Sequence, residues 1–145
     1  MEIRSISFLQ ARSIRREVLR PCGPESEIAY PGDAGESARH FGAFDGDRLT
    51  GVATFLPEPC PDGQETAAWR LRGMATIRPA QGRGVGGQLL QHGIERASAV
   101  GVTFIWCYGR TTARAFYERH GFRAVGEEFA LPNSGPHYLF VLRAA

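Results

Sequence analysis

The chain has 145 residues and a formal net charge of +2, with 43% hydrophobic and 22% charged residues. This composition is typical of one globular domain, so we expect a single domain over residues 1–145, and the small net charge argues against a nucleic-acid partner. No apolar run approaches the ~20 residues of a membrane span, and residues 1–4 do not open a signal peptide, so we expect a cytoplasmic protein without a membrane partner.

The first quarter of the chain predicts a short strand, a helix and a loop. The strand covers residues 2–5, and the apolar face of the helix is formed by Ala11, Ile14, Val18 and Leu19. Arg20-Pro21 ends this helix, and residues 21–36, rich in Pro, Gly, Glu and Ser, predict a loop. Three arginines fall on the outer side of the helix, where we expect solvent: Arg12, Arg15 and Arg16.

Strand-like runs follow at residues 39–44 and 49–55, and Asp45-Gly46 between them predicts a hairpin. A third run over 67–77 leads into a glycine-rich loop and a long helix, which Gly101 closes. The last third predicts a buried strand over 102–107, a helix over 113–120 capped by Thr111 or Thr112 and ended by Gly121, and strands over 122–129 and 137–142.

These elements give an order close to βαββββαβαββ, with parallel crossovers at the centre and hairpins at the flanks. The predicted fold class is therefore α/β, with a mixed central sheet of about six to seven strands flanked by helices. Three cysteines, Cys22, Cys60 and Cys107, lie far apart with no metal-ligand spacing, so we expect a reducing compartment and no metal.

The loop at residues 81–87 is the centre of the functional argument. It reads Gln81-Gly82-Arg83-Gly84-Val85-Gly86-Gly87, between a strand and a helix. Glycines there leave the first backbone N–H groups of the helix uncovered, and the helix dipole and Arg83 add positive charge. The loop therefore predicts a phosphate-binding cradle.

Three types of cradle share this appearance. A P-loop needs a lysine, and the chain contains none, which also means that any amine substrate other than the chain's own N-terminus comes from elsewhere. The dinucleotide pattern G-x-G-x-x-G is matched by Gly82, Gly84 and Gly87, but the acidic residue expected about 20 positions later is missing, because no acid lies between Glu95 and Glu118. A nicotinamide-dependent reductase therefore rests on glycines alone.

The third type of cradle is carried by two motifs together. Gln81-Gly82-Arg83-Gly84-Val85-Gly86 resembles the coenzyme A pyrophosphate loop of the GCN5-related N-acetyltransferases, Arg/Gln-x-x-Gly-x-Gly/Ala. The segment 113–122, with alanine, Phe116-Tyr117 and Gly121-Phe122, resembles the other common segment of that family, in the family's order. The resemblance extends over nearly the whole chain and implies the acyl-CoA N-acyltransferase fold.

The resemblance also implies site residues and an activity. It implies an acetyltransferase that moves an acetyl group from acetyl-CoA, as co-substrate, to a small-molecule or peptide amine in a ternary complex. The residues implied to hold acetyl-CoA are Met74, Ala75, Thr76, Gln81, Gly82, Arg83, Gly84, Val85, Gly86, Gly87 and Arg110. Tyr117 matches the tyrosine that protonates the departing thiolate, since a phenol of pKa about 10 stays protonated at pH 7.

The general base has no motif. The candidates are His137, in Gly135-Pro136-His137-Tyr138, and three weaker ones, His40, Glu65 and Glu128. The chain departs from its relatives where Tyr108-Gly109 replaces the usual Asn-Ala and Phe140 the usual Met. A non-catalytic acyl-CoA-binding module of the same fold is therefore an alternative, and a homodimer stays open because dimers are frequent in the family.

Overall fold

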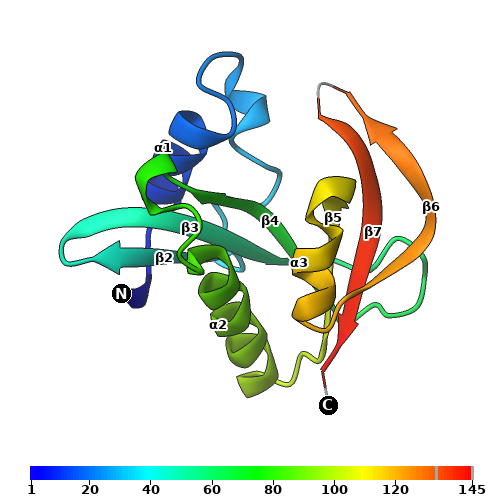
Figure 1. The fold of residues 1–145 in the computed structure, drawn as a ribbon. Helices are drawn as coiled ribbons and strands as arrows, with labels where there is room; N and C mark the ends of the chain where they lie inside the picture. The colour runs from blue at the N-terminus through cyan, green and yellow to red at the C-terminus, as the bar shows by residue number, and fades with distance from the viewer. Residues whose placement is uncertain (133, 145) are drawn as a thin grey trace.

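A computed structural model of the chain describes residues 1–132 and 134–144 (Figure 1). Seven strands form one sheet in the order β1-β2-β3-β4-β5-β7-β6. The strands are β1 (Glu2–Ser5), β2 (Arg39–Asp45), β3 (Arg48–Pro57), β4 (Trp69–Thr76), β5 (Phe104–Arg110), β6 (Arg123–Leu131) and β7 (Gly135–Arg143). Within the described residues β4–β5 is the one parallel pair, so the sheet is mixed, as predicted.

Three α-helices accompany the sheet: α1 (Phe8–Val18), α2 (Val85–Ala99) and α3 (Arg114–Arg119). The element order is βαβββαβαββ, so three strands lie between α1 and α2, and the prediction of four was wrong. The prolines and glycine of residues 57–63 lie beyond β3 in the loop that leads to β4, where no additional strand forms. None of the helices described is long and apolar enough to cross a membrane.

The predicted helix ends are partly confirmed. Gly101 and Gly121 follow α2 and α3 with φ of +85° and +91°, which favours glycine. The threonine cap of α3 was wrong, because a 3₁₀ turn over Thr111–Ala113 precedes the helix and no side chain caps it. The Thr111 hydroxyl instead donates to the Glu128 carboxylate at 2.7 Å.

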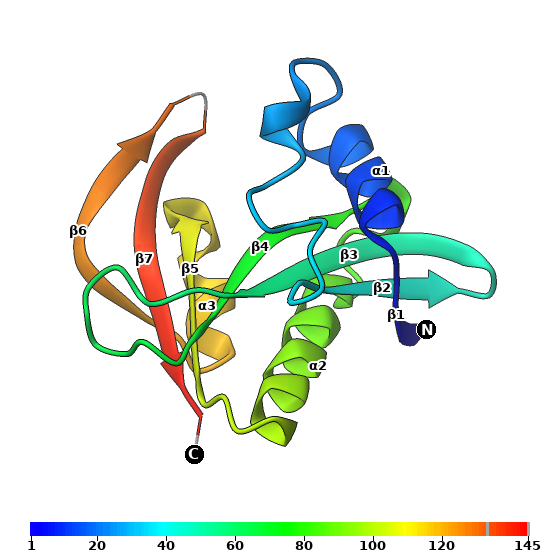
Figure 2. The ribbon, with the colours of Figure 1, turned by 180° about the vertical axis from the view of Figure 1, so that it is seen from behind.

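The helices cover opposite faces of the sheet. Phe55 of β3 packs so closely on Gly93 of α2 that an added Cβ would lie 2.0 Å from its ring. The neighbouring Thr54 points the other way and hydrogen-bonds Arg15 of α1 at 2.7 Å. By strand pairing, Leu71 of β4 and Cys107 of β5 point to the same side of the sheet as Phe55, and Cys107 lies next to α3. We therefore call the two sides the α2/α3 face and the α1 face; β5 lies behind α3 in Figure 1 and in front of it in Figure 2.

A buried ion pair joins the α1 face to the loop before β2. The prediction that Arg15 is solvated was wrong, since both Arg15 and its partner Asp33 are buried. Arg15 also donates to the Ile28 carbonyl at 2.8 Å, and the ring of His40 bridges Thr54 and the Asp33 carbonyl. Helical spacing alone placed Arg15 beside Arg12 and Arg16, and it carries no information about a loop that folds over that side.

Candidate functional site

The site lies where β4 and β5 separate. Their register is limited to Trp69 opposite Ile105 and Arg70 opposite Trp106, and beyond these pairs the strands diverge (Figures 1 and 2). The N–H of Ile77 donates to the Thr50 carbonyl of β3 at 2.8 Å. Because backbone groups alternate along a strand, those of Ala75 point toward β3 and those of Thr76 point toward the gap, up to the bulge at Gly73-Met74. The far half of β4 therefore presents backbone groups to an extended ligand, and the Thr76 carbonyl among them already accepts from the Gln81 side-chain amide at 3.0 Å.

A bulge in β4 borders this gap. The β3–β4 register shifts between Val52 and Thr54, opposite Gly73-Met74. Gly73 has φ of +62°, and a Cβ there would lie 2.6 Å from Nε of Arg15. Only glycine fits this position, because it meets both the positive φ and the close approach of the guanidinium.

The glycine-rich loop forms the floor of a cleft of about 740 Å³ on the α2/α3 face. Gly82 and Gly84 have φ of +78° and +79°, and no atom lies within 4 Å of the Cβ that either lacks. Gly84 is the N-cap of α2 and no side chain caps the helix, so the first-turn N–H groups face the cleft. The predicted cradle residues Thr76, Gln81, Gly82, Gly84, Val85, Gly86 and Gly87 line this cleft, and Arg83 does not.

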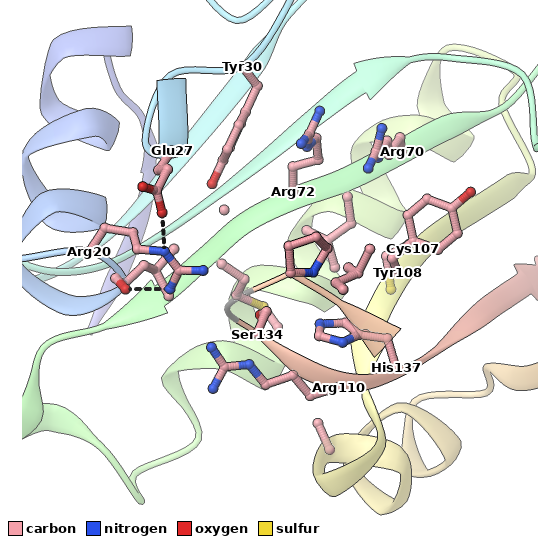
Figure 3. Close-up of a pocket in the computed structure, with 18 of the residues that line it drawn as sticks. Arg20, Glu27, Tyr30, Arg70, Arg72, Cys107, Tyr108, Arg110, Ser134 and His137 are labelled. Carbon is pink, nitrogen blue, oxygen red and sulfur yellow. Dashed lines mark hydrogen bonds and ion pairs between the residues drawn. The ribbon is translucent and has the colours of Figure 1, made fainter. Parts of the chain in front are cut away.

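A second cleft of about 940 Å³ opens where the strands diverge (Figure 3). Its walls come from the end of α1 and the following loop, from β4 and β5, and from the β6–β7 connection. Met74, Tyr117, His137 and Arg110 all line it. Phe116 lines both clefts, so the two are neighbours. Of the residues predicted to hold acetyl-CoA, Arg110 thus lies beside His137 and away from the glycines.

Tyr117 approaches the gap from the α2/α3 face. Its ring stacks on Phe140 with centroids 4.6 Å apart, and its hydroxyl lies next to the Cys107 thiol. Burial, and secondarily Cys107, raise the pKa of Tyr117 well above 10. Burial likewise raises the pKa of Cys107 to about 12, so both groups are neutral at physiological pH.

Two departures from the family pattern, Gly109 and Phe140, are in contact with each other near Tyr117. A Cβ on Gly109 would lie 2.5 Å from the Tyr117 ring and 2.8 Å from the Phe140 ring. The aromatic ring of Phe140 therefore occupies the room that an alanine methyl group at position 109 would need. The third departure, Tyr108, packs edge-on against Trp106 and Phe129 and forms one side of the second cleft.

His137 approaches the gap from the α1 face. The residue is only 4% exposed, and its Nδ1–H donates to the Gly135 carbonyl at 2.8 Å. In the neutral ring Nε2 then carries the free lone pair, so it can accept a proton. His137 pairs with Arg110 across β7 and β5, which places both side chains on one face of the sheet.

The other base candidates lie elsewhere. His40 is held in the network of Thr54 and Asp33, Glu65 lies 3.6 Å from Arg143, and Glu128 accepts from Thr111. None of the three lines the second cleft. Sequence reasoning did not single out Tyr30 and Arg72, which also line this cleft. Tyr30 comes from a loop without a recognisable motif, and Arg72 lies in the run Leu71–Ala75, which resembles the family but does not mark the Arg72 side chain.

Comparison with known proteins gives consistent matches. The model of the acetyltransferase (GNAT) family matches residues 8–122. A relative from Bacillus subtilis (strain 168), described as the uncharacterized N-acetyltransferase YitI, is 32% identical over 137 residues, covering 94% of this chain and 92% of the relative.

Solved structures agree in fold. A putative N-acetyltransferase from Lactobacillus plantarum superposes with a TM-score of 0.79 at 21% identity, covering 100% of both chains. An aminoglycoside 6'-N-acetyltransferase complexed with coenzyme A gives a TM-score of 0.76 at 15% identity, covering 99% of this chain and 97% of the other.

Proposed function

The chain belongs to the acetyltransferase (GNAT) family and is an acyltransferase, and on that premise we propose that it transfers an acetyl group from acetyl-CoA directly to an amine, with His137 and Tyr117 handling the protons. Enzymes of this family use acyl-CoA. The glycine-rich loop fits such a donor, because its backbone N–H groups are uncovered and Gly82 and Gly84 leave open space where side chains would stand. We assign the pyrophosphate to residues 81–87, with Arg83 as an additional cation, and the pantetheine arm to the backbone of Met74 and the N–H of Thr76, whose carbonyl is engaged by Gln81.

Bound acetyl-CoA supplies a thioester carbonyl that is open to attack by an amine. In our proposal Nε2 of His137 removes the proton that the attacking nitrogen must lose. A backbone N–H at the Met74 bulge donates to the carbonyl oxygen as it gains negative charge. The Tyr117 hydroxyl donates to the departing sulfur, and the sulfur of Cys107 already lies next to it.

The raised pKa of Tyr117 has two consequences for this role. It keeps the phenol protonated throughout the neutral and moderately alkaline range, so the donor is always present. It also makes the phenol a weaker acid than free tyrosine, so hydrogen bonding to the developing thiolate precedes the complete transfer of the proton.

The observation that carries the proposal is that the two groups reach the gap from opposite faces. Pairing of β5 with β7 places His137 on the α1 face. Tyr117 contacts Cys107 and Gly109, whose side-chain positions are on the α2/α3 face, so Tyr117 lies on that face. The gap between β4 and β5 is then the only break in the described sheet through which an amine on one side meets a thioester from the other.

Replacing Tyr117 with Phe tests the role of the hydroxyl. We expect kcat to fall by about 10²- to 10⁴-fold, the usual contribution of a positioned acid, while the thermal shift with acetyl-CoA persists. Release of free thiol from acetyl-CoA, measured with a panel of primary amines, gives kcat. Tyr138→Phe is the matched control, since Tyr138 also packs against Phe140.

Two outcomes would contradict the proposal. Unchanged kcat in Tyr117→Phe would remove Tyr117 as the donor to sulfur. Binding of acetyl-CoA by the wild type without turnover of any amine would favour the alternative, a non-catalytic acyl-CoA-binding module.

A further inference from the structure

The second cleft has an unbalanced set of charges. Arg20, Arg70, Arg72 and Arg110 line it, against the single acidic side chain of Glu27. Glu27 is already engaged by Arg20 at 2.8 Å, as Figure 3 shows, and Arg70 pairs with Glu58 at 3.2 Å. Arg72 and Arg110 have no carboxylate within 4.0 Å among the residues that the structure describes.

Arg72 is held in place without being neutralised. Its guanidinium lies 4.1 Å from the centre of the Tyr30 ring, and the guanidinium of Arg15 lies 4.4 Å from the same centre. Burial, and then the nearby charge of Arg70, lower the pKa of Arg72. A half-buried guanidinium beside a second one is costly in free energy, and an anion in the cleft would relieve that cost.

Arg110 stands on the other wall of the same cleft. It is exposed, comes from the end of β5, and is the register partner of His137, so its side chain shares the α1 face with the proposed base. Figure 3 shows Arg72 and Arg110 on different sides of the cleft, with His137 near Arg110. A ligand held by these arginines therefore lies next to the group that deprotonates the amine.

We propose that the acceptor is a small amine that carries an anionic group, a carboxylate or a phosphate, which Arg72 and Arg110 bind. The guanidinium fork suits both anions, since it offers parallel N–H donors to two oxygens. Polycationic amines are disfavoured by the same charges, because the one carboxylate lining the cleft is already paired. The inference rests on the proposed acetyltransferase function and specifies its substrate class.

Matched pairs of amines test this inference with the 145-residue chain. Phenylalanine against phenethylamine reports on the carboxylate, phosphoethanolamine against ethanolamine reports on the phosphate, and spermidine represents polycations. We expect the anionic member of at least one pair to have a kcat/KM about tenfold or more above its neutral counterpart, mostly through KM.

Variants of Arg72 then assign the effect to the residue. We expect Arg72→Gln to lower kcat/KM for the preferred anionic amine by about 10- to 100-fold, the usual range for a lost charge-assisted hydrogen bond. The effect on its neutral counterpart should be much smaller, and the Kd of acetyl-CoA should not change. Arg72→Lys, which keeps the charge, should recover part of the loss. Arg48→Gln, at the first residue of β3 and outside both clefts, is the control.

Binding separates this inference from the proposed function. Stabilisation of the CoA complex by an anionic amine, lost in Arg72→Gln, would support the substrate class even if no turnover occurred. Preference for neutral amines or spermidine, or an anionic preference that survives in both Arg72→Gln and Arg110→Gln, would overturn the inference and leave the acetyltransferase proposal standing.

Discussion

The two clefts of this molecule differ in the parts of the chain that form them: backbone in one, side chains in the other. The cleft on the α2/α3 face is formed largely by the backbone of one continuous loop, residues 81–87, with glycines wherever a side chain would intrude. The second cleft, at the gap between β4 and β5, is formed by side chains from at least four separate segments, and arginines and aromatic rings define it. The first type of site suits the part that acyl-CoA donors share, and the second can change with the acceptor while the fold is kept.

The largest expected effect is the loss of stability when the buried ion pair of Arg15 and Asp33, next to the second cleft, is broken. Arg15→Ala leaves Asp33 buried without its partner, and we expect it to lower the free energy of unfolding by about 3–5 kcal/mol. For a chain of this size that corresponds to a fall in melting temperature of roughly 6–20 °C. Thermal unfolding by circular dichroism measures it.

The control lies one turn away on the same helix. Arg12 pairs with Glu25 at the surface, 3.5 Å apart, and Arg12→Ala should cost less than about 1 kcal/mol. Equal losses in the two variants would mean that the network around Asp33 does not hold the loop, and the contrast between the two clefts would lose its structural basis.

A substitution in the glycine-rich loop should weaken the binding of acetyl-CoA without lowering the stability of the fold. A side chain at Gly86 would make ordinary contacts of 3.8–3.9 Å with Phe116 and Met74, in the cleft, so Gly86→Val should fold normally. We expect its Kd for acetyl-CoA to rise about 30-fold, roughly 2 kcal/mol, because close approach to the backbone is blocked. Isothermal titration calorimetry measures this.

Gly46→Ala should behave in the opposite way. Gly46 has φ of +62° in the β2–β3 turn, far from either cleft, so the substitution should cost roughly 1 kcal/mol of stability and leave the Kd unchanged. If Gly86→Val bound acetyl-CoA as the wild type does, the backbone cradle would not be the donor site.

The smallest effect concerns the thiol at the boundary between the faces. Because the pKa of Cys107 is raised from 9.0 to about 12, the folded state keeps a proton that the unfolded state loses. Its stabilising contribution is fully present below pH 9 and is lost progressively between about pH 9 and 12. At pH 10 this loss is on the order of 1 kcal/mol.

Cys107→Ala should remove that part of the pH dependence. Urea unfolding at pH 8 and pH 10 compares the two proteins, and the wild type should weaken more between these values than the variant. Identical pH dependence would show that the thiol ionises normally in the fold and that its surroundings are wetter than the burial of Cys107 indicates.

The same contrast explains how much the sequence could predict. The order of strands and helices along the chain predicted the mixed fold. Residues 74–87 and 113–122 predicted the cradle and the position of Tyr117, because a local motif fixes a local backbone. Arg15 was misassigned and Arg72 overlooked, because their environments depend on the loop over residues 21–38, whose fold has no periodic signal. The paired departures Gly109 and Phe140 could be noticed in the sequence, but their shared cause is a contact between two strands.

The opposite placement of Tyr117 and His137 also has a consequence for traffic through the enzyme. If the donor occupies the glycine cleft and the acceptor the arginine-lined cleft, the two substrates bind through separate openings. CoA then leaves from the glycine cleft and the acetylated product from the arginine-lined cleft. Neither molecule then has to wait for the other, so the order of arrival and departure is set by relative affinities and concentrations. Product inhibition should follow the same division, with free CoA competing with acetyl-CoA and the acetylated product competing with the amine.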